Sequence, residues 1–356
     1  MSIFAFHLLN DYSGSPKVLS QLLKGLVEKG EDVNIVTCSG RDGFLSDIKG
    51  ANYHYFWYNW HQNPFVRLFN YMLSQFLLFF KFLFLVKKGD IVYINTVLPF
   101  GAGLLGKLKS CQVVYHIHET SMKPLVLKKF LFGIVKLTAD KVIYVSNYLA
   151  QNEPVSSQST IVIPNAIDAN FLKIAQSFEK SICTNHVLMI CSLKKYKGVD
   201  EFVHLATISP LLNFRLIVNA SELEISTYFI NKKLPNNLEI LPTQTNVHPH
   251  YQWADIVLNL SKTDKWIETF GLTVIEAMAY GLPVIVPPVG GIAEIVSDGI
   301  NGYKVDSNNI EEIKNRLFDI ISNENLYKKM KVQSKLSLQN YSESKFLVRI
   351  QDYLLT

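Results

Sequence analysis

The sequence predicts an α/β protein made of two doubly wound domains. Short apolar runs typical of buried strands alternate with longer runs at helical spacing along almost the whole chain. With 356 residues, 48% of them hydrophobic, the chain is long enough for two separate cores. A polar linker is expected within residues 160–185, because a fresh series of strand and helix patterns starts after it. We therefore expect an N-terminal domain over residues 1–170, a C-terminal domain over residues 183–340, and a last helix over residues 341–356.

Composition and charge exclude several classes of protein. The net charge of +5 permits anionic partners, but the chain has no zinc-finger spacing, RNA-binding signature or long basic run, so we expect no nucleic acid. The N-terminus has no signal peptide pattern and resembles a first strand, which favours a cytoplasmic protein. The cysteines form no CxxC pair, which predicts free, buried thiols in a reducing compartment: Cys38, Cys111, Cys183 and Cys191.

The first domain opens with a βαβ pattern. A strand over residues 3–9 precedes a polar turn over residues 10–16, a helix over residues 17–29 and a strand over residues 32–37. Gly14 lies in the turn at the carboxyl end of the first strand, where open α/β sheets bind ligands. The turn lacks GxGxxG, so a dinucleotide fingerprint is absent.

Polar side chains also follow a later strand of this domain. Residues 90–95, 113–117 and 141–145 have the pattern of buried strands. His118 and Glu119 come directly after the second of these runs, so we place both at the edge of the sheet that binds ligands.

Residues 65–86 form the most apolar stretch of the chain. Its length approaches a transmembrane span, but it falls between two predicted strands of one sheet and is interrupted by Asn70, Ser74, Gln75 and Lys81. We interpret it as a helix that covers the sheet and has an unusually apolar outer face. A simple buried helix, or a helix that also touches a bilayer, are open alternatives.

A second apolar helix is predicted over residues 124–136. Its lysines would either face anionic lipid headgroups or form an ordinary solvated face: Lys123, Lys128, Lys129 and Lys136.

The second domain contains a stretch with several chemical features close together. Strands are predicted over residues 186–191, 214–218, 238–241 and 254–260, and the stretch ETFGLTVIEAMAYGLPVIVPPVGG follows, over residues 268–291. It reads as a turn, a helix, a short strand and a turn at two glycines. A helix start and a glycine pair suit a phosphate, and a carboxylate suits sugar hydroxyls. The stretch therefore favours a nucleotide diphosphate that carries a sugar, although each glutamate alone would suit a surface or cap position.

This stretch resembles the signature of glycosyltransferase family 4, whose members are retaining enzymes of the GT-B fold. The resemblance lies in two glutamates eight positions apart, FG after the first, then GLPV, GG and a further glutamate, Glu294. IVIPNAID, HIHE and CSLKKYKGVDEF also resemble family segments. The resemblance implies two Rossmann-like domains that face a cleft, with the last helix packed back on the first domain.

The resemblance also implies residue roles. The diphosphate would be bound by Lys197 and by backbone groups. The backbone groups are those of Phe270 and Gly271, the helix start at Leu272 and Thr273, and Gly14. Glu268 would hold the transferred sugar, Glu276 the ribose, and His118 would line the cleft near the sugar. Glu294 would orient the glycine loop.

Two positions depart from the family pattern. Ser192 stands where the family usually has arginine, which removes a permanent cation from the donor site; Lys194 or Lys195 would replace it only in part. Gly14 is followed by Ser15 where relatives often have a second glycine.

The activity implied is transfer of a hexosyl group, with retention, from a nucleotide-diphosphate sugar, a UDP-sugar favoured, to a hydroxyl group. No DxD sequence occurs, so we expect neither a metal nor another cofactor. The apolar and lysine-rich helices suggest a glycan or polyprenyl-linked acceptor, peripheral contact with the inner face of the cell membrane, and bacterial surface-polysaccharide synthesis. The alternatives are a non-catalytic nucleotide-sugar-binding relative, a GT-B phosphorylase or epimerase, and less readily a glycoside hydrolase or a NAD-dependent oxidoreductase.

Overall fold

The computed structural model describes residues 1–156, 159–179 and 185–355, and it divides into two compact units. The first unit comprises Met1–Asn165 and Ser344–Thr356, and the second comprises Ala166–Glu343. The sequence places the boundary a few residues later, inside a linker that extends to residue 185. Part of that linker, with Cys183, lies outside the described residues.

The first unit contains a seven-stranded parallel sheet in the order β3-β2-β1-β4-β5-β6-β7. Phe4 in β1 pairs with Asn34 in β2 and with Val92 in β4, so β1 is a central strand with neighbours on both sides. The strands are mostly runs of buried Val, Ile and Tyr, as expected for a sheet that is covered on both faces. Their bounds are β1 Ser2–Phe6, β2 Asp32–Cys38, β3 Asn52–Phe56, β4 Ile91–Asn95, β5 Gln112–Ile117, β6 Lys141–Tyr144 and β7 Ser159–Val162.

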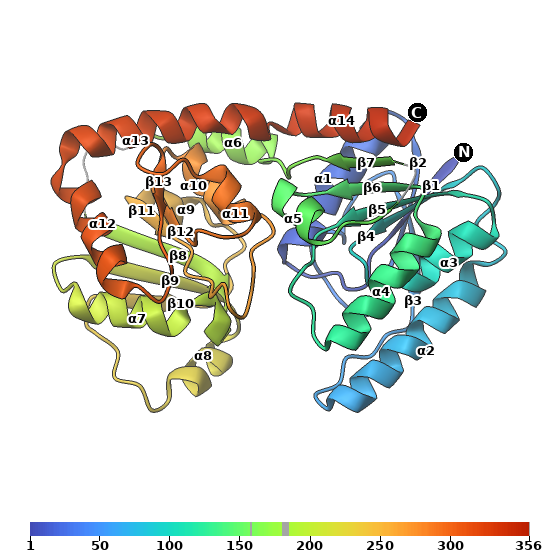
Figure 1. Cartoon of the computed structure of the whole chain (residues 1–356), viewed down its shortest axis with the longest axis horizontal. Coiled ribbons are helices and arrows are strands. Elements are labelled where there is room, and N and C mark those ends of the chain that lie inside the picture. The colour runs from blue at the N-terminus through green and yellow to red at the C-terminus, as the bar shows by residue number, and fades with distance from the viewer. Residues whose placement is uncertain (157–158, 180–184, 356) are drawn as a thin grey trace. The chain divides into compact units, whose positions relative to one another are not determined.

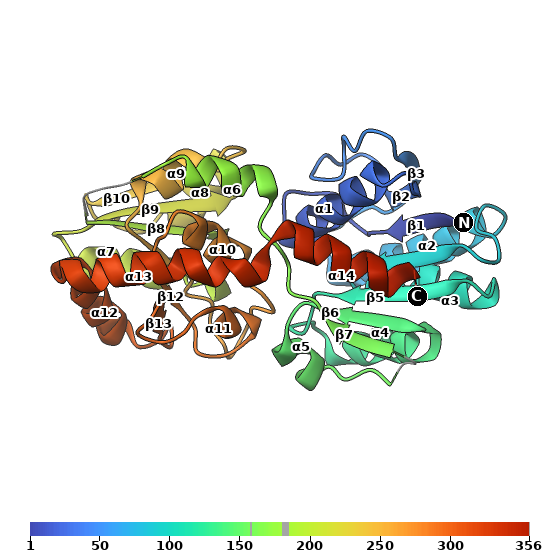
Figure 2. The ribbon, with the colours of Figure 1, turned by 90° about the horizontal axis from the view of Figure 1, so that it is seen from above.

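Helices cover both faces of this sheet (Figures 1 and 2). One face carries α1 (Gly14–Glu28) and the C-terminal helix α14 (Glu343–Leu355), which pack so closely that a Cβ on Gly25 would come within 2.7 Å of Leu347. The other face carries α2 (Pro64–Phe82), α3 (Phe100–Leu108) and α4 (Leu125–Thr138). The short helix α5 (Asn147–Asn152) follows β6.

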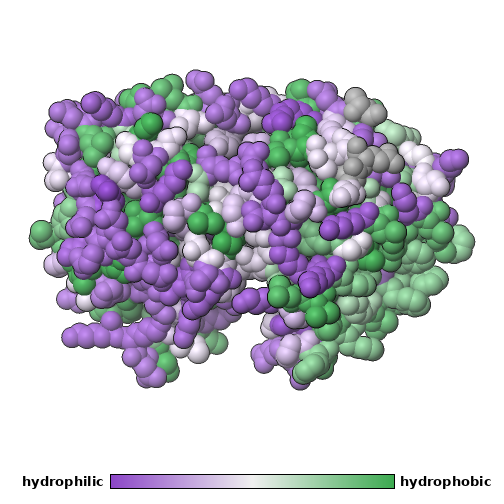
Figure 3. Space-filling model, in the orientation of Figure 1, coloured by the Kyte–Doolittle hydropathy of each residue, from purple (hydrophilic) through white to green (hydrophobic). Residues whose placement is uncertain are grey.

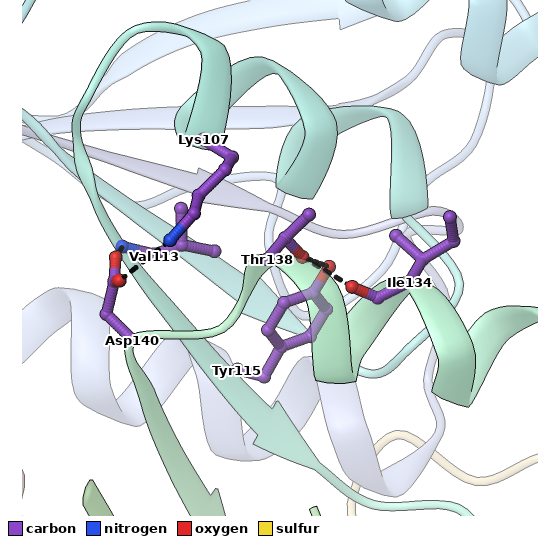
Figure 4. A network of polar contacts seen from close by, with 6 residues as sticks. All are labelled: Lys107, Val113, Tyr115, Ile134, Thr138 and Asp140. Atoms are coloured by element: carbon purple, nitrogen blue, oxygen red, sulfur yellow. Dashed lines mark hydrogen bonds and ion pairs between the residues drawn. The ribbon is translucent and has the colours of Figure 1, made fainter. Parts of the chain in front are cut away.

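Glycines allow α3 to lie directly on the sheet. A Cβ on Gly103 would overlap the hydroxyl of Tyr115, and one on Gly106 would come within 2.6 Å of Val113. Figure 4 shows the polar contacts beneath this layer: the Tyr115 hydroxyl lies 3.1 Å from Oγ1 of Thr138, at the end of α4. Thus α3, α4 and β5 form one closely packed block.

The second unit contains a six-stranded parallel sheet in the order β10-β9-β8-β11-β12-β13. Met189 in β8 pairs with Leu216 in β9 and with Leu258 in β11, so the order of the chain reverses at β8. The strands are β8 His186–Ser192, β9 Asn213–Asn219, β10 Leu238–Leu241, β11 Ile256–Leu258, β12 Val284–Val286 and β13 Gly302–Lys304.

One hydrophobic core of this unit lies between the sheet and two helices, α7 (Val199–Ile208) and α12 (Ile310–Ser322). Phe202 of α7 meets Phe214 of β9 edge-on at 5.4 Å. A second group of helices includes α10 (Leu272–Ala279), which contacts α6 and α13. The remaining helices of the unit are α6 Ala169–Gln176, α8 Glu222–Phe229, α9 His248–Trp253, α11 Gly291–Ile295 and α13 Glu324–Ser337.

Four details differ from the sequence-based expectation. The turn expected over residues 10–16 is shorter, because α1 already begins at Gly14. The turn expected at Gly290 and Gly291 becomes the start of α11. The expected linker contains α6 of the second unit. Finally, β3 lies in an aromatic stretch for which no strand was predicted, because its exposed edge position gives no buried pattern.

The free-thiol prediction holds for the described cysteines. Cys38 and Cys111 are unpaired and buried, while Cys191 is unpaired and half-buried. Among the residues that the structure describes, no helix combines the length and hydropathy needed to cross a membrane.

Candidate functional site

The second sheet reverses its order between β8 and β11, which is the point where open α/β sheets place their ligands. Because all its strands are parallel, the segments that follow β8, β11 and β12 start at one edge. Lys197 follows β8, Glu268 follows β11 and Gly290 follows β12. The fold therefore gathers three of the motifs identified in the sequence.

Lys197 and Glu268 form the centre of this edge. The Nζ of Lys197 lies 2.5 Å from Oε1 of Glu268, and Oγ of Ser261 lies 2.6 Å from the same oxygen. Burial raises the pKa of Glu268, but the Lys197 ammonium and the two hydrogen bonds outweigh it, so that pKa lies below its ordinary value. The ammonium also lies 4.8 Å from the centre of the Trp266 ring. The pair thus presents a fixed cation beside an ionised carboxylate.

Two glycines with left-handed backbone hold this pair in place. Gly198 has φ +78° and a Cβ there would overlap the carbonyl of Leu260, while Gly290 has φ +106° and a Cβ there would overlap the carbonyl of Glu268. Only glycine adopts these conformations without strain and also allows such close approach. The backbone that carries Lys197 and Glu268 therefore depends on both positions.

Gly290→Ala is expected to lower nucleotide affinity by about tenfold, because the added methyl group moves Glu268 as well as straining φ. Gly299→Ala is the matched control. Gly299 also has φ +73°, but a Cβ there meets no atom within 4 Å. Calorimetric titration of both variants with UDP checks the prediction, which fails if the two variants bind alike.

The start of α10 is the second feature of this edge. Gly271 is its N-cap and has no side chain with which to cap the first N–H groups, which include those of Leu272 and Thr273. Such a helix start suits an anion. The side chain of Phe270 is buried against Tyr341, at 5.8 Å between ring centres, so only its backbone remains for the donor role assigned to it.

The start of α11 lies close to that of α10. A Cβ on Gly271 would come within 2.8 Å of Ile292 in α11, and the N–H of Ile292 lies 3.4 Å from the carbonyl of Glu268. Glu294 is exposed in the first turn of α11. Its predicted role in orienting the glycine loop stays a prediction.

Glu276 lies one turn into α10 and is buried. Its Oε2 accepts a hydrogen bond of 2.7 Å from the hydroxyl of Tyr251 in α9. Burial, and then the charge of Glu276, raise the pKa of Tyr251 well above its ordinary value, so the phenol keeps its proton. Tyr251 therefore fixes one oxygen of the carboxylate that we assign to the ribose.

Ser192 stands where the family usually has arginine, and the serine side chain supplies no positive charge there. Ser192 is the last residue of β8, and its carbonyl accepts a 2.7 Å hydrogen bond from the N–H of Lys194. The side chains of Lys194 and Lys195 are both exposed, whereas that of Lys197 is half-buried and paired. Among these residues, Lys197 is the one that the fold holds at a defined position.

The first sheet has its own reversal of order, between β1 and β4, and Asn95 at the end of β4 connects the segments around it. Its Oδ1 lies 2.9 Å from Nε2 of His118, and its Nδ2 donates to the carbonyl of Ser15 at 3.1 Å. His118 and the start of α1 at Gly14, both predicted site residues, are thereby linked through a residue that no motif indicated. Burial, and then the charges of two other histidines, lower the pKa of His118 well below its ordinary value.

Glu119 ties the loop after β4 to the end of β5. Its carboxyl group accepts hydrogen bonds from the N–H groups of His118 and Val97 and from the side chain of Thr96. Thr96 has φ +76°, which is unusual for a β-branched residue and requires support from its surroundings. Burial outweighs these bonds and raises the pKa of Glu119 to about 7.

A raised pKa means that the folded protein holds this proton more tightly than the unfolded chain does. Stability should therefore fall as pH rises from the ordinary glutamate value through about 7, by on the order of 2 kcal/mol. Glu119→Gln keeps the neutral form and should remove this dependence. Melting temperatures at pH 5.5 and pH 8 check it, with the exposed Glu311→Gln as control, and parallel curves for wild type and Glu119→Gln would contradict it.

The structure therefore assembles the eleven predicted site residues in two groups. His118 and Gly14 belong to the first unit, and the second unit holds Glu268, Lys197, Glu276, Ser192, Phe270, Gly271, Leu272, Thr273 and Glu294. Sequence analysis missed Asn95, Tyr251 and Ser261. The positions of Asn95 and Ser261, at and directly after the carboxyl ends of predicted strands, could have pointed to both, whereas no signal pointed to Tyr251.

Comparison with known proteins identifies the family and the fold of the chain. Residues 12–171 match the model of "Glycosyltransferase Family 4", and residues 173–336 match that of "Glycosyl transferases group 1". An uncharacterised glycosyltransferase of Methanocaldococcus jannaschii is 25% identical over 270 residues, which is 74% of each chain.

Two solved structures share the fold. Anabaena HepE with UDP-glucose has 18% identity, 99% coverage of both chains and a TM-score of 0.81. Staphylococcus aureus TarM, solved with UDP and other ligands, has 13% identity, coverage of 100% and 99%, and a TM-score of 0.77.

Two Rossmann-like units of this kind, each with a reversal in strand order, are the architecture of the GT-B fold. The two family models together match nearly the whole chain, and the chain belongs to glycosyltransferase family 4.

Proposed function

We propose that this protein transfers a sugar, with retention, from a nucleotide-diphosphate sugar to a hydroxyl group of a glycan or lipid-linked acceptor. The observation that carries the proposal is the Lys197–Glu268 pair beside the helix starts of α10 and α11. At the ligand-binding edge of one sheet, it combines groups that can bind an anion with a carboxylate that can accept hydrogen bonds from hydroxyl groups.

The chemistry requires stabilisation of the diphosphate as the glycosidic bond breaks. The ammonium of Lys197 and the N–H groups at the two helix starts would take the developing charge. No metal is needed in this scheme, because these groups can supply positive charge, and no other cofactor is proposed. When donor enters, the ammonium would turn toward phosphate, and Glu268 would then accept hydrogen bonds from the sugar.

A UDP-sugar is the donor that we favour. HepE and TarM, which share the fold, were solved with UDP-glucose and with UDP respectively. Glu276, held by Tyr251, would accept hydrogen bonds from the ribose, which is common to all ribonucleotides, so it does not select the base. His118, fixed by Asn95, would line the acceptor side with its imidazole neutral at physiological pH.

We also propose that the protein is cytoplasmic, contacts the inner face of a bacterial cell membrane peripherally, and acts in surface-polysaccharide assembly. A lipid-linked acceptor would require such contact.

The test is release of UDP from a panel of UDP-sugars in the presence of EDTA, with and without glycan and polyprenyl-phosphate-linked acceptors. We expect release that depends on acceptor and persists in EDTA. Release without any acceptor would favour phosphorolysis, epimerisation or hydrolysis instead. Binding of UDP without release from any donor and acceptor pair would favour the non-catalytic relative that Ser192 suggests.

A further inference from the structure

Helix α2 carries large apolar residues on its outer side as well as on the side that covers the sheet, where Tyr71 and Phe82 are buried. The sheet-facing side also includes Gln75, whose Oε1 accepts a 3.2 Å hydrogen bond from the N–H of Gly101. The outer side carries Phe65, Phe69 and Phe76, exposed to 82%, 66% and 60%. A helix on the surface of a soluble protein normally has charged and polar residues on its outer side. The prediction of an apolar outer face is thus confirmed, and the alternative of a simple buried helix is wrong.

The apolar surface continues beyond α2. Figure 3 shows it over the positions of α2 and α4 in Figure 1. Such a continuous area exceeds the scattered apolar residues that every protein exposes. We call it the α2–α4 face; its exposed apolar residues are Phe65, Val66, Leu68, Phe69, Phe76, Leu77, Phe80, Phe84, Leu85, Leu125, Val126, Phe130 and Leu137.

Charge on these helices has a single sign. The segments of α2, α3 and α4 contain no Asp or Glu, but they contain six cations: Arg67, Lys81, Lys107, Lys128, Lys129 and Lys136. Lys129 and Lys136 are exposed and lie seven positions apart, on one side of α4. The face therefore combines apolar side chains with positive charge.

The structure contradicts the prediction that Lys128 faces lipid headgroups. Lys128 is half-buried and its ammonium pairs with Glu153 in the same unit. Lys107, on α3, pairs with Asp140, whose carboxylate also accepts from the N–H of Val113 at 2.9 Å (Figure 4). Lys107 thereby links α3 to the residue before β6, and Lys128 links α4 to the end of α5.

We infer that the α2–α4 face docks on an anionic lipid bilayer. Phenylalanine and leucine side chains would enter the boundary between headgroups and acyl chains, while Lys129 and Lys136 would meet lipid phosphates. A second copy of this chain fits less well, because two such faces would bring lysine against lysine without a carboxylate on either helix layer.

This inference deepens the peripheral membrane contact proposed above, on which it rests, and the observations that carry it lie outside the donor site. It concerns the first unit only and needs neither donor nor catalysis. If the protein is a transferase with a lipid-linked acceptor, docking places the enzyme at the bilayer that contains this acceptor.

The experiment is sedimentation of the full chain with vesicles, without nucleotide. Vesicles of phosphatidylcholine are compared with vesicles containing 30% phosphatidylglycerol, a composition that we choose for the test. Phe69→Ser with Phe76→Ser, and Lys129→Glu with Lys136→Glu, are the test variants. Leu223→Ser with Ile230→Ser, equally exposed on the second unit, is the matched control. Melting temperatures verify that all three variants fold.

We expect the wild type and the control to sediment with anionic vesicles and much less with neutral ones. Each test variant should lose roughly tenfold in its partition coefficient. Wild type that remains in the supernatant with both vesicles, or a phenylalanine variant that sediments like wild type, would overturn the inference. A dimer in analytical ultracentrifugation that Phe69→Ser with Phe76→Ser dissociates would assign the face to a second copy instead. UDP release by soluble donor and acceptor is measured separately, so failure of docking and failure of the transferase proposal can be told apart.

Discussion

Lys197→Met is expected to slow sugar transfer by about 10²–10³-fold, the usual effect of removing one group that stabilises developing charge. The ammonium sits beside Glu268 at the ligand-binding edge of the second sheet, where it can reach a diphosphate. Methionine keeps most of the length and the apolar contact with Trp266 but removes the charge. Steady-state kinetics with saturating donor would measure the loss, which should appear in kcat as well as in kcat/KM.

The same substitution has a second expected result, on stability. Without the ammonium, the carboxylate of Glu268 loses its main compensation for burial, and its pKa should rise. Lys197→Met should therefore lower the melting temperature at pH 7, and Lys197→Met with Glu268→Gln should recover it without recovering transfer. The control is Lys195→Met, two positions away and exposed. Normal kcat in Lys197→Met would remove this lysine from the mechanism.

Glu276→Ala is expected to weaken UDP binding by about 10- to 100-fold, because hydrogen bonds to a charged group contribute about 1.5–3 kcal/mol. The carboxylate is buried in α10, where the hydroxyl of Tyr251 donates a hydrogen bond to its Oε2. Calorimetric titration with UDP and with ribose 5-diphosphate, which lacks the uracil, would measure the loss of affinity.

Loss should be similar for both ligands if Glu276 contacts the ribose. Tyr251→Phe removes only the hydroxyl that fixes the carboxylate and should give a smaller loss in the same direction. Glu311→Ala, exposed on α12, is the control. Unchanged UDP affinity in Glu276→Ala would exclude the ribose role.

Much of the fold could be predicted because the local patterns and the tertiary contacts agree. The strand Leu238–Leu241 has the predicted bounds, and the helix and short strand predicted within residues 268–291 are Leu272–Ala279 and Val284–Val286. Helix formers, a glycine cap and β-branched residues all favour the same structure there. The edge strand β3 was missed because half of its residues face solvent, and α6 because a short amphipathic helix in a polar stretch resembles a linker.

The site was predictable only where a motif carried it. Glu268, Lys197 and Glu276 stand in motifs, but their partners Ser261 and Tyr251 are an isolated serine and an isolated tyrosine, joined to them only by the fold. Asn95 is likewise brought to His118 by the pairing of β4 with β5. The pairing of Lys128 with Glu153 could not be foreseen, because twenty-five residues and a strand separate them.

The most direct test of the account is the binding of nucleotide diphosphates in EDTA, followed as the melting temperature of the wild type, Lys197→Met and Glu276→Ala. The account predicts that UDP stabilises the wild type, more than GDP, ADP or TDP do, and stabilises both variants much less. Absence of any shift in the wild type, or equal shifts in the wild type and both variants, would contradict a nucleotide site at this edge of the second sheet.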